Sequence, residues 1–145
     1  MIVSTKGRYA LRLMLDLAIY NTGAPVSIKD IAKRQDISEK YLEQIVSALN
    51  KAGFVRSIRG AQGGYILTRT PIDYTVGTIL RLIEGNLSPV SFLEENSLPE
   101  DSVGEEVTRR VYEKMYDAIN NVVDGITLAD LVQWQNEGAG DFYCI

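Results

Sequence analysis

The stretch SIKDIAKRQDISEKYLEQIVSALNKAGFVRSIRGAQGGYIL, Ser27–Leu67, determines the fold of this chain. It begins with two short helical patterns, each preceded by a serine of the type that caps helices. The first covers residues 28–34 after Ser27, and the second begins at residue 39 after Ser38. Only residues 35–37 form the turn between them, a spacing that predicts a helix-turn-helix.

The period of the apolar residues changes after Gly53. Residues 54–58 and 65–68 are rich in β-branched and aromatic side chains, which predicts two strands. The segment RGAQGG, residues 59–64, separates them and is typical of a turn. A β-hairpin directly after a helix-turn-helix predicts a winged helix.

Further helical patterns flank this unit, at residues 5–21 after Ser4, 76–83 after Thr75, 105–123, and 127–135. Residues 86–104 have no periodicity. The predicted fold class is therefore mainly α with a small β-hairpin, a winged helix-turn-helix plus a long C-terminal dimerisation helix. We divide the chain into a winged helix-turn-helix DNA-binding domain (1–85), a linker loop (86–104), a dimerisation helix with a short following helix (105–135) and a flexible C-terminal tail (136–145).

Composition restricts the chemistry that is open to the chain. It has 145 residues, 46% of them hydrophobic, which fits one compact domain. It contains no histidine and one cysteine, Cys144, which excludes a Cys/His zinc site and an internal disulfide. We expect no metal or other cofactor, no signal peptide or membrane span, and a reduced, cytoplasmic protein. Trp134 and the tyrosines are expected in the core.

Charge is divided unevenly along the chain. Residues 1–69 hold 11 Lys and Arg against 5 Asp and Glu, whereas residues 70–145 hold 4 against 14. A net charge of +6 on the first half indicates an anionic partner, although an uneven solvated surface is the alternative.

The winged helix predicts which side chains contact DNA, because its second helix enters the major groove. Gln44 can pair with adenine and Glu43 can accept from cytosine. The full set of predicted DNA-binding residues is Lys6, Arg8, Ser38, Lys40, Tyr41, Glu43, Gln44, Arg56, Arg59 and Gly60. A polar solvated face is the alternative for the helix. A nucleotide site is the disfavoured alternative for the glycine-rich turn, because the sequence GxxxxGK[ST] is absent and the glycines lie within a predicted hairpin.

The pattern over residues 105–123 carries an apolar stripe but leaves little chain to cover it. In a winged-helix protein a two-fold dimer buries such a stripe and matches a palindromic site. Packing on its own domain is the alternative.

Three separated motifs, STKGRYA (4–10), YLEQ (41–44) and RGAQGGY (59–65), resemble the Rrf2 family of bacterial winged-helix regulators. The resemblance covers about residues 1–135. It implies a homodimer that represses transcription at interrupted palindromes of double-stranded DNA. It also implies that Tyr41 and Gln44 contact the major groove, that Glu43 discriminates among classes of site, and that Arg59 enters the minor groove.

The family divides on an iron–sulfur cluster, which some members bind through three linker cysteines. Here the linker has none: Phe92 stands where the first is expected, and Ser97 and Ser102 lie near the others. Thiolates are the ligands that such clusters require, so we expect no cluster. A cysteine-substituted regulator of iron–sulfur or redox genes is the alternative.

The cluster-free branch of the family represses cysteine and sulfur-assimilation genes with cysteine synthase as corepressor. The segment SPV (88–90) and the ending FYCI (142–145) resemble that branch. The resemblance implies that Phe142, Tyr143 and Ile145 bind cysteine synthase, with Ile145 entering its active site. The alternatives are a tail that packs on the dimer or frays, and a redox-sensitive thiol at Cys144.

Two other functional classes remain open from the residues alone. One is an enzyme using serine or lysine, which no motif supports. The other is a protein-interaction module without DNA binding, and the salt dependence of DNA affinity would separate it from a repressor.

Overall fold

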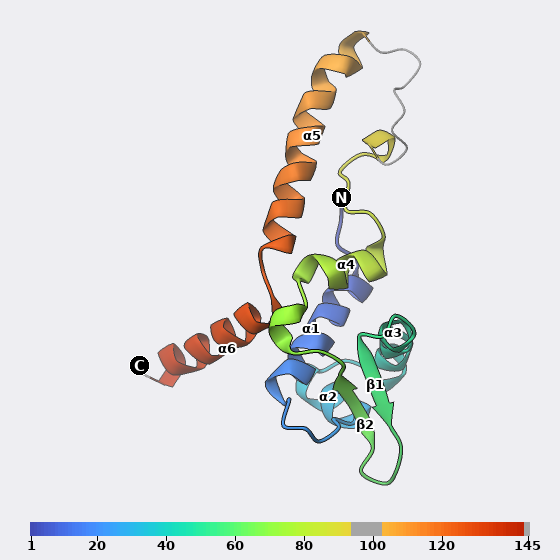
Figure 1. The fold of residues 1–145 in the computed structure, drawn as a ribbon, viewed down its shortest axis with the longest axis vertical. Coiled ribbons are helices and arrows are strands. Elements are labelled where there is room, and N and C mark those ends of the chain that lie inside the picture. The colour runs from blue at the N-terminus through green and yellow to red at the C-terminus, as the bar shows by residue number, and fades with distance from the viewer. Residues whose placement is uncertain (94–102, 144–145) are drawn as a thin grey trace.

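The computed structural model describes residues 1–93 and 103–143 (Figure 1). The hairpin is antiparallel, and the mainly helical winged-helix class predicted from the sequence is confirmed. The elements in chain order are α1 (Thr5–Ile19), α2 (Ile28–Gln35), α3 (Glu39–Lys51), β1 (Val55–Ile58), β2 (Gly64–Leu67), the 3-10 turn η1 (Pro71–Asp73), α4 (Val76–Glu84), the 3-10 turn η2 (Ser91–Leu93), α5 (Val103–Asp124) and α6 (Leu128–Tyr143).

Serine caps define the helix starts. The Ser4 hydroxyl accepts a hydrogen bond from the Gly7 amide, and Ser38 does the same for Tyr41. Ser27 likewise caps α2. Between α2 and α3, Asp36 adopts a left-handed conformation with φ of 54°, which ends α2 and turns the chain sharply into α3. The predicted helix-turn-helix is therefore present.

The hairpin is anchored to the body at two points. Tyr65 of β2 exchanges two backbone hydrogen bonds with Val26, which lies just before α2. The buried Tyr74 hydroxyl donates to the Phe54 carbonyl at 2.7 Å and accepts from the amides of Thr68 and Arg69 at 3.1 Å. The wing is therefore fixed at its base by buried polar contacts, which are costly to leave unpaired.

The core lies between α1, α3, α4 and the base of the hairpin. α1 lies at its centre, because Leu13, Met14 and Leu17 are almost completely buried. Leu42, Ile45 and Leu49 bury one face of α3 against it, which leaves the opposite face of that helix exposed.

Helix α5 extends away from this body (Figure 1). It begins at Val103, two residues before the predicted start, and Arg81 of α4 pairs with Asp124 near its other end. Four apolar side chains on one face of α5 are 45–69% exposed: Val107, Val111, Met115 and Val122. Among the described residues these four side chains stay uncovered, whereas Ile119 of the same helix packs against the cluster of Val76, Leu80 and Leu87, so packing on its own domain accounts for only part of the predicted stripe.

The predicted flexible spacer at residues 136–140 is wrong, because α6 continues through Tyr143. Gly138 and Gly140 cost the helix about 1 kcal/mol each, which is too little to end it. Gln133 also supports the helix with a hydrogen bond to Glu137 at 3.0 Å. The last two residues of the predicted tail, Cys144 and Ile145, lie outside the described residues.

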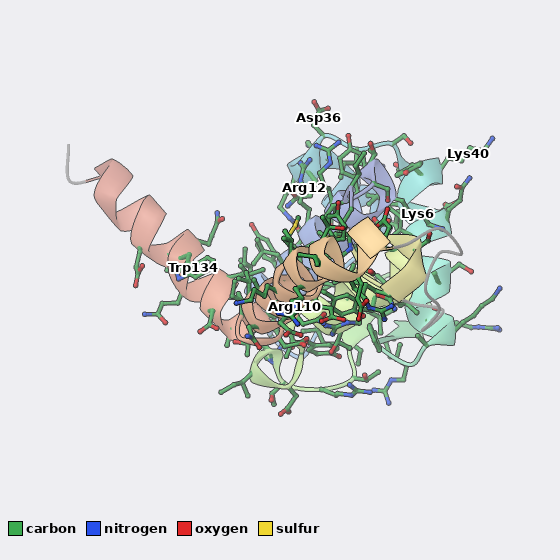
Figure 2. The ribbon with its side chains drawn as sticks, turned by 90° about the horizontal axis from the view of Figure 1, so that it is seen from above. Lys6, Arg12, Asp36, Lys40, Arg110 and Trp134 are labelled. Carbon is green, nitrogen blue, oxygen red and sulfur yellow. The ribbon has the colours of Figure 1, made fainter. Side chains whose placement is uncertain are left out.

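The expectation that Trp134 belongs to the core is also wrong. Its side chain is 52% exposed, and Figure 2 shows it on the part of α6 that projects from the body. Only the first turns of α6 reach the core, through Leu128, Leu131 and Val132. Residues 133–138, which follow on the same helix, are all exposed.

The predicted linker loop is partly ordered by η2. Its residues 94–102, including Ser97 and Ser102, lie outside the described part of the chain. Within the described ranges, no helix has the length and apolar character needed to cross a membrane.

Candidate nucleic-acid interface

The start of α3 presents polar side chains on its exposed face. Lys40, Glu43 and Gln44 are exposed, whereas Leu42 and Ile45 of the same turns are buried. Ser38 caps the helix and is itself exposed. The structure therefore brings these four predicted residues to one end of the helix, where a major groove is read.

Tyr41 differs from its neighbours because its side chain is half-buried. Its ring meets that of Tyr9 edge to face, with centroids 5.6 Å apart and an interplanar angle of 88°. We predicted Tyr41 to point toward solvent or DNA. In the structure, the Tyr41 ring packs instead against the second turn of α1, which passes beside α3.

The wing carries its arginines on the outside. Arg56 on β1 and Arg59 in the turn are both exposed. Gly60 is exposed and has φ of 124°, a conformation that a side chain disfavours. A cationic tip of this kind suits a narrow minor groove.

The other two glycines of the turn are required by close contacts within the chain itself. A Cβ on Gly63 would lie 2.3 Å from the Ile58 carbonyl oxygen, and one on Gly64 would lie 2.2 Å from that of Val26. These glycines are needed for the close approach of the chain to itself. They therefore give no independent support to a contact between the wing backbone and DNA phosphate.

A second cationic group lies at the first turn of α1. Lys6 and Arg8 are both exposed, and Arg8 donates to the Thr5 hydroxyl at 3.2 Å. Figure 2 shows Lys6 and Lys40 on the same side of the molecule. In Figure 1 the hairpin tip lies at the opposite end of the body from the start of α1. The two cationic groups are therefore separated, with α3 part of the surface between them.

Two further exposed residues, one on α3 and one directly after β2, are not in the predicted set. Ser47 lies one helical turn after Glu43, and that four-residue spacing was the available signal. Arg69 follows β2, and its guanidinium lies 5.6 Å from the centre of the Phe54 ring. The sequence did not indicate that Arg69 lies near the end of α3, because this proximity depends on the hairpin register, in which Val55 pairs with Leu67.

An iron–sulfur cluster does not fit the residues of this chain. The single cysteine, Cys144, cannot supply the set of thiolates that such a cluster needs. Among the described residues, no group of three His, Cys, Asp or Glu side chains is placed to hold a metal ion.

Comparison with known proteins gives matches over almost the whole chain. Residues 3–134 match the Rrf2 family model, described as iron-dependent transcriptional regulator. The transcriptional regulator CymR of Bacillus subtilis is 44% identical over 132 residues, covering 91% of this chain and 90% of the relative.

Two solved structures share the fold. One is CymR (YrzC), the global cysteine regulator of B. subtilis, with a TM-score of 0.81, 43% identity, and coverage of 92% of this chain and 98% of that one. The other is IscR of T. potens, with a TM-score of 0.78, 46% identity, and coverage of 95% and 90%.

Proposed function

Because this chain belongs to the Rrf2 family of transcriptional regulators, we propose that it is a dimeric repressor that binds an interrupted DNA palindrome without an iron–sulfur cluster. It is a regulator and not an enzyme. The observation that carries the proposal is the exposed start of α3, which presents Lys40, Glu43 and Gln44 beside a cationic wing.

In this proposal some side chains contact base edges and others contact the phosphate backbone. Gln44 and Glu43 read base edges in the major groove, and Arg59 enters the minor groove beside Gly60. The remaining predicted residues contact the phosphate backbone and fix the register of the protein on the duplex; they are Lys6, Arg8, Ser38, Lys40, Tyr41 and Arg56.

The dimer in this proposal forms through the exposed face of α5. Burying apolar side chains such as Val111 and Met115 removes them from water, and a two-fold axis gives both chains the same contact. Two recognition helices related by that axis match the symmetry of a palindrome.

The experiment that tests DNA recognition is selection from a random duplex library with the full chain. We expect enrichment of an interrupted palindrome. Lack of enrichment for any sequence would contradict the proposal. Light scattering on the selected complex reports the stoichiometry, for which we expect two chains on each duplex.

We also propose that the regulated genes belong to cysteine metabolism, with cysteine synthase as corepressor. Support comes from the similar protein of B. subtilis, which is a global cysteine regulator, and from the absence of linker cysteines here. In this proposal the partner captures the segment that contains Phe142, Tyr143 and Ile145.

Calorimetric titration with cysteine synthase tests the corepressor. We expect the intact chain to bind, deletion of Ile145 to abolish binding, and O-acetylserine to compete with it. Failure of the intact chain to bind would remove the corepressor from the account and leave DNA recognition untouched. Cys144 would then be the group to examine as the signal-responsive thiol.

A regulator of iron–sulfur or redox genes is the second candidate, because the chain is also 46% identical to the IscR of T. potens. The two candidates differ in cluster chemistry. Anaerobic incubation with iron and sulfide is expected to leave this chain without cluster absorbance. Stoichiometric cluster uptake would favour the second candidate.

A further inference from the structure

The first turn of α1 is held by a residue from a distant part of the chain. Glu84, at the C-terminal end of α4, accepts hydrogen bonds through Oε1 from the Ser4 amide at 2.8 Å and the Ser4 hydroxyl at 2.5 Å. Ser4 is the N-cap of α1, and its hydroxyl in turn accepts from the Gly7 amide at 3.0 Å. The carboxylate thus fixes the cap, and its charge faces the positive end of the helix.

Gly7 is independent evidence that the carboxylate belongs there. Gly7 is buried inside the first turns of α1, where glycine is a poor helix former. A Cβ at this position would lie 2.1 Å from Glu84 Oε1 and 3.1 Å from its Cδ. The glycine leaves the space that the carboxylate occupies.

The helix that carries Glu84 is itself held in place. Arg81, one turn earlier on α4, donates to both carboxylate oxygens of Asp124 at 2.6 and 2.9 Å and to Asn120 at 2.8 Å. Ile79 and Leu80 of α4 are buried. Glu84 therefore projects from an element fixed on both the core and α5.

The turn that Glu84 fixes carries Lys6 and Arg8, which are exposed. Both point from backbone whose position depends on the capped start of α1. We propose that Glu84 is a positioning residue for DNA binding, which holds this turn so that Lys6 and Arg8 reach the phosphate backbone. This inference rests on the proposed function, because it assigns those two cations to DNA.

A comparison of Glu84→Ala with Glu84→Gln tests the inference on the full chain. The glutamine amide oxygen can accept both bonds from Ser4, so we expect Glu84→Gln to keep affinity within about twofold of wild type. Glu84→Ala loses both bonds, and we expect DNA affinity to fall about tenfold. The probe is the duplex selected from the random library, and thermal unfolding verifies that each variant is folded at the assay temperature.

The salt dependence separates a positioning role from a merely structural one. If Lys6 and Arg8 no longer reach phosphate, the salt dependence of binding becomes weaker in Glu84→Ala. The magnitude of the slope of log affinity against log salt then decreases by up to about two. In a Lys6→Ala/Arg8→Ala background, Glu84→Ala should then cause no further loss. A loss of thermal stability with unchanged affinity and slope would overturn the inference.

Gly7→Ala provides a second variant that reaches the same contact from the other side. Its Cβ displaces the carboxylate, so we expect it to weaken binding as Glu84→Ala does. The double variant Gly7→Ala/Glu84→Ala should bind no worse than Glu84→Ala alone. Additive losses in the double variant would overturn the inference.

Two outcomes distinguish this inference from the proposed function. Wild-type affinity in Lys6→Ala/Arg8→Ala, with sequence-specific binding intact, would overturn the role of Glu84 and leave the repressor in place. Absence of specific binding by the wild-type chain would overturn both.

Discussion

Among the described residues, two arginine–aspartate pairs join helices, and they differ in burial. Arg34 of α2 donates to both oxygens of Asp16 on α1, at 2.7 and 3.0 Å, and the Asp16 side chain is 1% exposed. Gln35 donates to the same carboxylate at 3.1 Å. Arg81 pairs with Asp124 in similar geometry, but that carboxylate is 46% exposed. The first pair ties the helix-turn-helix to α1, and the second ties α4 to α5.

Asp16→Asn is expected to destabilise the protein far more than Asp124→Asn. Asn keeps one acceptor oxygen, but it loses the charge and turns the other oxygen into an amide donor that faces Arg34 or Gln35, at a cost of about 2–3 kcal/mol; partial exposure of Arg34 limits it. The exposed pair is screened by water, so its loss costs less than about 1 kcal/mol. Urea unfolding measures both. Equal losses would contradict the assigned role of burial.

The Arg81–Asp124 pair predicts a dependence of stability on pH. The hydrogen bond from Arg81 lowers the pKa of Asp124 from its ordinary value, with partial burial opposing it. A lowered folded-state pKa means that the stabilisation is complete above the unfolded pKa and is lost as pH falls through the folded one. The difference in unfolding free energy between wild type and Asp124→Asn should therefore persist at neutral pH and shrink as the pH falls below the ordinary aspartate pKa of about 4.

At the scale of single residues, contacts between residues close in the sequence could be predicted, and contacts between distant residues could not. The caps Ser4, Ser27 and Ser38 act within three residues, so the sequence alone predicted them. The bonds from Ser4 to Glu84 span 80 residues, and no local pattern encodes them. The contact of Tyr41 with Tyr9 was missed for the same reason.

At the scale of elements, α5 and α6 both extend away from the body, and each carries exposed apolar side chains. The apolar spacing of α5 was predictable because it repeats over several turns. The end of α6 was not, because Gly138 indicates a break while the neighbouring residues permit a helix. Trp134 lies on that extension, which explains why residue type alone misplaced it.

Val111→Asp is expected to convert a dimer into a folded monomer. Val111 is 55% exposed within one chain, so the substitution leaves the core intact and places a charge in the proposed interface. Analytical ultracentrifugation measures the change in mass. The matched control is Arg110→Asp, which should remain dimeric; Arg110 is exposed (labelled in Figure 2) and lies about 100° around the helix from Val111. Identical masses for the two variants would contradict the assignment of this face.

At the scale of the whole molecule, charge and shape are arranged together. The basic first half forms α1 to β2, which carry the candidate DNA surface, whereas the acidic second half includes α5. Separation of the signs keeps like charge away from the phosphate backbone. This distribution and the helix-turn-helix were visible in the sequence, but the way α4 links the two halves through Arg81 and Glu84 required the fold.

The central claim is that the winged helix binds DNA through its recognition helix and wing. The most direct test is fluorescence anisotropy of the selected duplex and a scrambled one, for Arg59→Ala and the matched control Arg110→Ala, over a range of salt. We predict that Arg59→Ala loses about 1–3 kcal/mol on the selected duplex, that Arg110→Ala loses none, and that wild-type affinity falls steeply with salt. Equal affinity of wild type and Arg59→Ala for the selected duplex would contradict this claim. So would a wild-type affinity that does not change with salt concentration.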